Sequence, residues 1–487
     1  MSNLEASPSS NNPGAQPTPP HNPDRAGLRP GRLGAGAIIF FVVAAVAPMA
    51  ALVGASPIVF SAQGPTAPMV YLLAALLFAV FSVGYVAMSR HITNAGGFVA
   101  YIARGLGCRV ATASAALAIL FYGTLQAALW SQFSVFAQSL LAGKLGVNIP
   151  RWVILFGTLI VVTGLVVKGV DLSLKVLGIL VALEIGAFVV LDTAIISGGG
   201  ASGNSLTAFS PAGLFGPGLG VAFLFAFACF TGFEATVVFS EEAKQPRRTI
   251  PRAVYGSIGF IGGFYALSAW ALGNAAGSDS VQAAAAADPA GFVFAIAERE
   301  VGPWLSAVME ILVVSSFIAM LIGFQNMFAR YVFALGRAHV LPSRLGDASP
   351  RSGSPTAAAL SVSALLAVIL AGFELAGADP ISVTFSWLLS LGTVALIAIL
   401  IATSVAIVTF FIRTRLEQNP WVTIVGPVLA IAGFGCVAYL AITNYDVLLG
   451  GQGGIAKWLL VLIPVLAVAG YLWAIVRPGI DYEAELV

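Results

Sequence analysis

The chain has 487 residues, of which 59% are hydrophobic and only 9% are charged, with a formal net charge of +2. Soluble globular proteins carry about 25% charged residues, so this composition excludes a soluble protein and predicts one that crosses a membrane several times. The three cysteines, Cys108, Cys229 and Cys436, are too few for a disulfide framework and lack the spacing of metal ligands. No metal site and no cofactor are expected.

Residues 1–32 are rich in Pro, Ser and Asn and are predicted to form a disordered cytoplasmic tail. After this tail, apolar segments recur that reach the roughly 20 residues needed to cross the hydrocarbon core of a bilayer. Twelve spans are predicted, at 34–62, 67–89, 108–141, 151–168, 174–197, 217–241, 252–275, 303–333, 355–373, 383–411, 421–443 and 455–476. The connection 277–300 is expected to be an outer loop that holds one short interfacial helix.

The placement of the basic residues predicts the orientation, because cytoplasmic loops of membrane proteins carry an excess of Lys and Arg. With the N-terminus inside, nineteen of the 23 Lys and Arg fall on the cytoplasmic side. Only Lys144, Arg151, Arg299 and Lys457 fall outside. Both termini, including the short tail 477–487, are therefore expected to be cytoplasmic, in a multi-pass protein of the cytoplasmic (plasma) membrane.

Two of the spans carry helix-breaking residues near their middles. The first contains Pro48, Gly54 and Pro57, and the sixth contains Gly232. Proline removes a backbone donor, and glycine lowers the cost of leaving the helix. Spans 1 and 6 occupy corresponding positions if the first ten spans form two halves of five, and this pattern indicates an inverted-repeat transporter with its site at the midplane. The alternative is an ordinary proline kink in one span and a packing glycine in the other.

Three segments resemble the amino acid–polyamine–organocation (APC) superfamily. "FTGFEATVVFSEEAKQPRRTIPRAV" (230–254) resembles that family's sixth helix and the loop after it. "MSRHITNAGGFVAYIARGLG" (88–107) is similar to the segment between helices 2 and 3, and "NMFARYVFALGRAHVLPSRLGDASPRSGSPTAA" (326–358) to the loop between helices 8 and 9. The resemblance extends over residues 33–476.

The resemblance implies an all-α polytopic membrane protein with a LeuT-like fold of twelve transmembrane helices. Residues 33–200 and 201–413 would form two inverted five-helix repeats, followed by helices 11 and 12 in residues 414–476. Helices 1 and 6 would be discontinuous, with the substrate bound at their unwound middles. The implied function is a secondary active amino acid permease that works by alternating access, with the proton rather than sodium as the expected coupling ion. A polyamine or small-amine transporter and an amino acid exchanger are the alternatives, and no nucleic acid partner is expected.

A broken helix can bind an amino acid without charged side chains, since its free N–H groups face the carboxylate and its free carbonyls face the ammonium. Many family members carry G-S-G or G-T-G in helix 1, where this chain has "APMAALVGASP". Either Gly54–Ala55–Ser56 or Ala50–Ala51–Leu52 can align with that signature, and the sequence does not choose between them. The candidate substrate-binding residues are Ala47, Pro48, Ala50, Ala51, Gly54, Ala55, Ser56, Cys229, Phe230, Thr231 and Gly232.

Four polar residues within the spans are candidates for coupling or gating. Glu234 falls at the family's G-F-E position and is expected to be a protonatable gate residue or a carboxylate that caps the unwound backbone, since a charge at the bilayer centre costs about 2.5–3.5 kcal/mol. Glu184 stands where proton-coupled relatives often have a lysine, and it is expected to carry a proton or to bond a neighbouring helix. Ser315 and Ser316 resemble the hydroxyl pair that lines the family's ion site, unless they bond their own helix.

Two further acids, Asp192 and Glu310, are expected at helix ends or in a vestibule rather than in the site. Rival functions lack their signatures: the sequence has no P-loop, no G-x-S-x-G elbow and no H-E-x-x-H, so no enzyme is expected. A channel would be expected to show repeated pore helices or rings of like charge, whereas this sequence shows two spans with helix-breaking residues.

Overall fold

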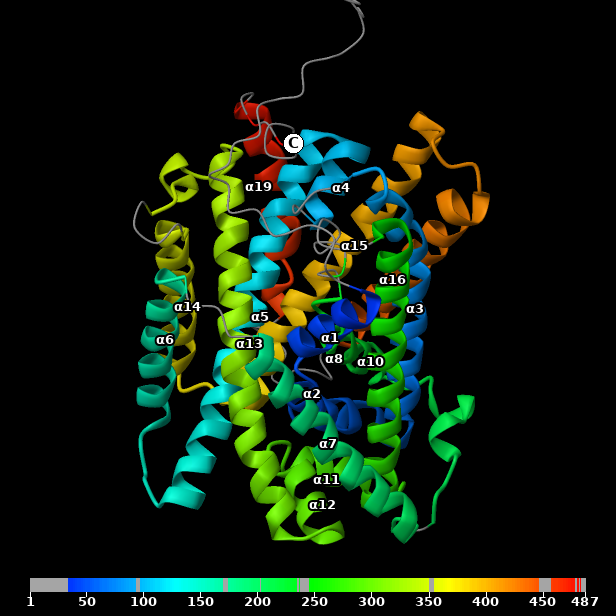
Figure 1. Cartoon of the computed structure of the whole chain (residues 1–487), viewed down its shortest axis with the longest axis vertical. Helices are drawn as coiled ribbons and strands as arrows, with labels where there is room; N and C mark the ends of the chain where they lie inside the picture. The colour runs from blue at the N-terminus through cyan, green and yellow to red at the C-terminus, as the bar shows by residue number, and fades with distance from the viewer. Residues whose placement is uncertain are drawn as a thin grey trace, which may run out of the picture.

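The structure, a computed structural model, describes residues 34–92, 97–169, 174–201, 203–233, 236, 245–349, 354–445, 457–477, 480 and 482. Over these ranges the chain is all-helical and contains no strand (Figure 1). Nine helical segments of the described chain are long and apolar enough to cross a membrane, and four shorter apolar helices accompany them. The prediction of a multi-pass helical membrane protein is therefore confirmed, whereas the count of twelve crossings stays a prediction.

The first part of the chain forms seven helices. The first predicted span is split in two, and part of the segment between the second and third predicted spans forms a short helix of its own. The helices are α1 (Ala35–Val46), α2 (Pro48–Gln63), α3 (Ala67–Ser89), α4 (Gly97–Leu106), α5 (Cys108–Leu145), α6 (Arg151–Val167) and α7 (Leu174–Gly198).

The second part forms the remaining helices, two of which begin with a short π-helical turn, η6 (Pro380–Phe385) and η7 (Trp421–Val425). The helices are α8 (Leu219–Ala228), α10 (Pro246–Ala276), α11 (Val281–Ala287), α12 (Phe292–Glu300), α13 (Pro303–Arg337), α14 (Thr356–Leu375), α15 (Ser386–Thr414), α16 (Gly426–Thr443) and α19 (Leu462–Val476). The expectation of one short helix in 277–300 is wrong, because α11 ends at Ala287, just before Asp288 and Pro289, and a second helix, α12, follows.

Burial separates a central group of helices from a peripheral one. Every residue of α8 from Leu219 to Phe227 is buried, as expected for a helix that is apolar all round and lies in the interior. By contrast, only Gly470 and Ala474 are buried in α19, so most of its apolar surface is free to face lipid. Figure 1 shows α1, α2 and α8 in the middle of the bundle, with α11 and α12 at one end and α4 near the other.

Glycines allow several helices to approach one another at backbone distance. A Cβ on Gly220 of α8 would collide with the backbone of Leu440 in α16, and one on Gly105 of α4 would collide with the backbone of Ala406 in α15. Small residues are typical of such contacts within membranes, where packing rather than water exclusion holds helices together. These contacts hold the peripheral helices against the centre, where the two helix breaks lie.

Candidate functional site

The first helix break lies between α1 and α2, at Ala47 and Pro48. Ala47 adopts a left-handed conformation with φ 52° and ψ 77°. Pro48 has no N–H to donate, so the hydrogen-bond ladder of α1 cannot run on into α2. As a result, the carbonyls of Ala45 and Val46 accept no hydrogen bond from the described residues. The break therefore leaves acceptors on one side and the amino end of a new helix on the other.

The amino end of α2 has few donors to offer. The Ala51 N–H bonds the Ala47 carbonyl at 3.0 Å, and Pro48 has no N–H. The Met49 N–H donates to Oε2 of Glu184 at 3.1 Å, and the Glu184 side chain is only 2% exposed. The Ala50 N–H has no partner among the residues that the structure describes. A helix N-terminus carries a partial positive charge, so a carboxylate is stabilised there.

The second break follows α8, which ends at Ala228. Residues 229–233 continue as tight turns, in which the N–H of Phe230 bonds the Phe227 carbonyl at 2.9 Å and the N–H of Thr231 bonds the Ala228 carbonyl at 3.1 Å. Gly232 has φ 110°, a conformation that residues other than glycine rarely adopt. This glycine lies in the turn that follows the end of α8.

The two breaks face each other. A Cβ built on Gly232 would lie 3.6 Å from Cγ2 of Val46 and 3.8 Å from Cβ of Ala45. The tertiary structure thus brings the break in the first predicted span into contact with the turn after α8 in the sixth, although Ala47 and Gly232 are 185 residues apart in sequence. The carbonyls of Ala45 and Val46, which accept no hydrogen bond from the described residues, thus lie near the turn after α8.

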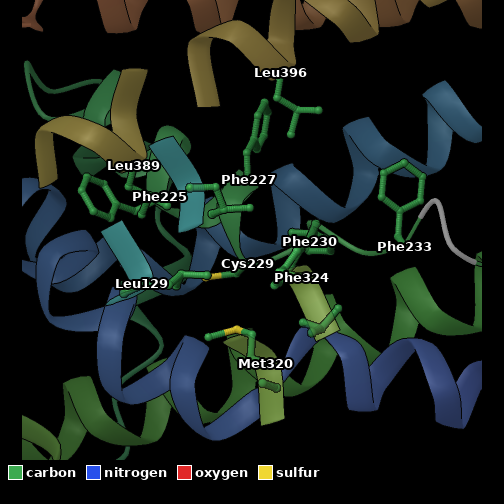
Figure 2. Close-up of a cluster of buried hydrophobic side chains, with 14 of the residues drawn as sticks. Leu129, Phe225, Phe227, Cys229, Phe230, Phe233, Met320, Phe324, Leu389 and Leu396 are labelled. Carbon is green, nitrogen blue, oxygen red and sulfur yellow. The ribbon is translucent and has the colours of Figure 1, made fainter. Parts of the chain in front are cut away.

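Apolar side chains surround this place. Figure 2 shows the residues around the second break, with aromatic side chains from α8 and the following turn next to α5, α13 and α15. The labelled members are Leu129, Phe225, Phe227, Cys229, Phe230, Phe233, Met320, Phe324, Leu389 and Leu396. Phe78 of α3 stacks on Phe230, with ring centroids 5.2 Å apart. Within this setting the hydroxyl of Thr231 is buried and has no hydrogen-bond partner among the described residues.

The other candidates of the first span lie further along α2. Gly54 is seven residues past the break, and its carbonyl accepts a hydrogen bond from Nε2 of Gln132 in α5 at 2.9 Å. The Ser56 hydroxyl donates to the Leu52 carbonyl of its own helix. Ala50 and Ala51, by contrast, lie in the first turn after the break. Gln132 is a polar contact that the sequence did not single out, although a glutamine in the middle of an apolar span is a signal that could have revealed it.

The coupling candidates fall into different environments. The Ser315 hydroxyl donates to the Leu312 carbonyl of its own helix at 2.9 Å. Ser316 is buried beside Glu184, but its hydroxyl lacks the geometry of a full hydrogen bond to the carboxylate. Glu234 lies outside the described residues. The structure therefore brings Glu184 and Ser316 to the first break and directs the Ser315 hydroxyl to its own backbone.

One expectation about the acids is wrong. Asp192 was expected at a helix end or in a vestibule, but it is only 4% exposed and accepts a hydrogen bond from Oγ of Ser268 in α10 at 2.6 Å. Its spacing from Glu184, eight residues along α7, was the signal that both acids share one helix face. Glu310 is half-buried and lies 3.3 Å from Nζ of Lys144. Among the described residues, no cluster of His, Cys, Asp and Glu could hold a metal ion.

These observations define the protein as a polytopic helical membrane protein in whose interior the break between α1 and α2 meets the turn after α8. A family profile described as amino acid permease matches residues 33–469. The chain therefore belongs to the amino acid permease family, within the APC superfamily. Membership of this family places the chain among transporters rather than enzymes.

Similarity to individual curated proteins is more distant. The chain is 27% identical over 321 residues to the branched-chain amino acid permease BcaP of Lactococcus lactis subsp. cremoris, covering 58% of this chain and 63% of the relative. It is 23% identical over 321 residues to the chloroplastic cationic amino acid transporter 7 of Arabidopsis thaliana, covering 61% and 53%. With the vacuolar cationic amino acid transporter 8 of the same plant it shares 28% identity over 141 residues, covering 29% and 23%. The alignments thus span less than two-thirds of each relative's length.

Proposed function

We propose that the chain is a secondary active permease that carries an amino acid through the membrane by alternating access, in symport with protons. The family supports a transporter, and the relatives named above carry amino acids in their names. In this proposal the fold is LeuT-like, with twelve crossings, inverted repeats at 33–200 and 201–413, and helices 11 and 12 in residues 414–476. Both termini are cytoplasmic and the membrane is the plasma membrane, as the positive-inside rule predicts.

The substrate is placed where the two breaks meet. Its ammonium bonds the carbonyls of Ala45 and Val46, which accept nothing from the described residues, together with the Thr231 hydroxyl. Its carboxylate accepts a hydrogen bond from the Ala50 N–H at the amino end of α2, where the helix dipole favours negative charge. The sequence left two alignments of the family's G-S-G signature open. This substrate position favours Ala50–Ala51–Leu52 over Gly54–Ala55–Ser56, because the Gly54 carbonyl is bonded to Gln132.

The surroundings of the site favour a neutral amino acid with an apolar side chain. Phe225, Phe227 and Phe230 lie around the second break, with Met320 and Phe324 of α13 beside them (Figure 2). Burial in such a pocket stabilises an apolar side chain, whereas a charged side chain would need a group of opposite charge beside it. Among the described residues, Glu184 is the acid in contact with the first break.

The hydrogen bond from the Met49 N–H to the Glu184 carboxylate is the observation that carries the coupling. An ionised carboxylate holds this N–H in a charge-assisted bond, and protonation weakens that bond because the charge is lost. Protonated Glu184 then releases the Met49 N–H to a substrate carboxylate, so that a proton and an amino acid bind together. No Lys, Arg or His of the described chain lies within ion-pair distance of Glu184.

The same bond supports one second candidate, a permease for small amines. Glu184 already occupies one of the two N–H groups that α2 could offer to an anion. A substrate with an ammonium and no carboxylate would leave that bond intact and could still bond the carbonyls of Ala45 and Val46, which accept no hydrogen bond from the described residues. An amine would therefore enter with Glu184 ionised, and an amino acid would enter with Glu184 protonated.

Transport by the purified protein in liposomes tests these proposals. Radiolabelled amino acids would be supplied with an inward pH gradient or, separately, with an inward sodium gradient. Accumulation that follows the pH gradient and disappears with a protonophore is the expected result. Accumulation driven by sodium alone, or uptake only against preloaded amino acid, would contradict proton symport. Transport of small amines in place of amino acids would favour the second candidate.

A further inference from the structure

Two neighbouring side chains of α5 hold two different elements of the bundle. Nε2 of Gln132 donates to the Gly54 carbonyl of α2 at 2.9 Å, and Oγ of Ser131 donates to the Pro380 carbonyl of η6 at 2.9 Å. Both side chains are almost fully buried, Gln132 with 2% and Ser131 with 1% exposure. Adjacent residues of an α-helix point about 100° apart, so one level of α5 holds two elements on different sides. The proposed transport step uses neither bond.

The contact with α2 is closely fitted. A Cβ built on Gly54 would lie 2.6 Å from Oε1 and 3.0 Å from Cδ of Gln132. Glycine at this position thus makes room for the amide group of Gln132. One turn further on, Pro57 lies inside α2. Since proline has no N–H, the carbonyl of Val53 lacks its usual helical donor, and α2 is weakened next to the point where α5 holds it.

The contact with η6 is also made at an irregular place. η6 is a π-helical turn, whose hydrogen bonds span five residues instead of four, and such turns are frequent at functional sites. Phe385 of this turn packs against Phe225 of α8, with ring centroids 5.8 Å apart. Phe225 is one of the aromatic side chains around the second break (Figure 2). Ser131 therefore holds a turn that touches the surroundings of the proposed substrate position.

Both contacts lie on the predicted outer side of that position. Helix α2 begins at the first break and leads toward the predicted outer face, so Gly54 lies about 6 Å beyond Ala50 along the helix axis. η6 lies at the end of the tenth predicted span that is expected outside. The two elements that α5 holds therefore belong to the outer half of the bundle.

The part of α5 that makes these contacts is itself firmly held. Oγ of Ser134 donates to the Ser131 carbonyl at 2.6 Å, and Nη1 of Arg151 donates to Oγ of Ser134 at 3.2 Å. Arg151, the first residue of α6, also pairs with Glu374 of α14 at 2.6 Å. Helices α6 and α14 lie side by side (Figure 1). This ion pair ties three helices together, so that α5 is a fixed support for α2 and η6.

We propose that Ser131 and Gln132 form an outer latch, which holds α2 and η6 over the substrate position while both hydrogen bonds are made. When the bonds break, α2 and η6 move away from α5 and the site opens to the outer face. Water that enters then bonds the carbonyls of Gly54 and Pro380, so neither is left without a partner in the open state. The two side chains act through the backbone of other elements and are positioning residues. The latch rests on the proposed alternating access.

The native thiol of Cys229 reports the opening. Cys229 lies at the second break and is 5% exposed, so a membrane-impermeant methanethiosulfonate reagent reaches it from outside only when the site is open to that side. The full chain with Cys108→Ser and Cys436→Ala, in which Cys229 is the remaining cysteine, is labelled in intact cells. Gln132→Ala and Ser131→Ala are each expected to speed the labelling by about three- to tenfold, the effect of one hydrogen bond on an equilibrium.

Matched variants separate the latch from a general loosening. Ser131→Thr keeps the hydroxyl group and should label like the parent chain. Gly54→Ala displaces the Gln132 amide from the other side of the bond and should speed labelling as Gln132→Ala does. Gln138→Ala is the control, because Nε2 of Gln138 also donates to a backbone carbonyl, that of Ile149, but holds the loop between α5 and α6. Its labelling is expected to stay unchanged.

Transport gives a second readout. A larger share of outward-open protein raises the apparent affinity for external substrate, so the KM for uptake of radiolabelled leucine by the cells should fall about as much as labelling rises, while kcat does not rise. A merely structural loss would lower kcat without lowering KM. Counterflow in liposomes, which exchanges labelled for unlabelled leucine and needs no net proton movement, is expected to persist in every variant and shows that the variants are folded.

The outcomes separate the latch from the function on which it rests. Labelling of Cys229 that stays the same in Gln132→Ala, Ser131→Ala and Gly54→Ala, or that is absent from every chain, overturns the latch. Equally fast labelling in Gln138→Ala would mean that the loss of any bond loosens α5, and overturns it as well. If labelling rises as expected but neither leucine nor another amino acid is taken up, the latch stands and the proposed amino acid transport is wrong.

Discussion

The backbone N–H of Met49 donates a hydrogen bond to the Glu184 carboxylate, 3.1 Å away, and so joins α2 to α7 across 135 residues of sequence. Both groups are buried. The bond exists because Ala47 and Pro48 interrupt the first helix and expose the amino end of α2, where a negative charge is stabilised. A proton that neutralises Glu184 would therefore act directly on the helix break.

Replacement of Glu184 by glutamine is expected to uncouple transport from the pH gradient. The amide keeps the shape of the side chain and an acceptor oxygen for Met49, but it cannot take up a transferable proton. Accumulation in liposomes with an inward pH gradient should fall to the level seen without the gradient, while counterflow persists. Glu310→Gln should behave like wild type. Unchanged pH-driven accumulation in Glu184→Gln would contradict the role of this residue.

The left-handed conformation of Ala47 predicts a stability difference between two variants. An L-residue pays roughly 1–2 kcal/mol in this region, and glycine does not. Ala47→Gly is therefore expected to raise the thermal midpoint of the detergent-solubilised protein, by an amount equivalent to about 1 kcal/mol. Ala47→Val should lower the midpoint, because a β-branched side chain is strained there and the site is buried. A lower midpoint for Ala47→Gly would show that the break is not held at this residue.

The close approach of α8 and α16 depends on Gly220. A methyl group at this position would collide with the backbone of Leu440, which cannot move aside as a flexible side chain could. Gly220→Ala is therefore expected to destabilise the protein by about 1–3 kcal/mol, measured as a lower thermal midpoint. Gly435→Ala in α16 is the control, since nothing lies within 4 Å of its added Cβ. That variant should be neutral or slightly stabilising, because alanine is the better helix former.

Asp379 caps the turn that begins the tenth predicted span. Its Oδ1 accepts hydrogen bonds from the N–H groups of Ile381 at 3.0 Å and Ser382 at 2.7 Å, and from the Ser382 hydroxyl at 2.8 Å. Partial burial on its own would raise the pKa of Asp379, but these bonds and the charge of Arg151 outweigh it, and the pKa lies below the ordinary value of 3.8. Asp379→Ala is expected to cost about 1 kcal/mol of stability at neutral pH.

The sign of the pH dependence follows from this lowered pKa. A carboxylate with a lower pKa in the folded state stabilises the fold above the unfolded pKa, and the contribution is lost as the pH falls through the folded value. The difference in thermal midpoint between wild type and Asp379→Ala should therefore be constant near neutral pH and shrink below about pH 4. A difference that stays constant down to the lowest pH would mean that the charge of Asp379 does not contribute.

Much of the architecture could be predicted from the order of residues alone. Long apolar runs and a low charge content indicated a multi-pass helical protein, since a bilayer admits only segments that satisfy their own backbone. The motifs around Gly232 and Arg337 indicated the superfamily that the family profile then showed. Pro48 and Gly232 marked the breaks, because their backbone properties are local and act in any surrounding structure.

Other features depended on contacts between distant segments. The register of the first break, at Ala47 rather than Gly54, was open because several residues of that span can end a helix and packing selects among them. Asp192 was misplaced because its burial depends on α10, whose Ser268 lies 76 residues away. The sequence by itself determined that the chain is a multi-pass helical membrane protein and where its helices can break, since hydrophobicity and backbone freedom are properties of single residues. Only the tertiary structure decided that Glu184 meets Met49 and that Asp192 is buried, because such contacts form when helices far apart in the chain pack side by side.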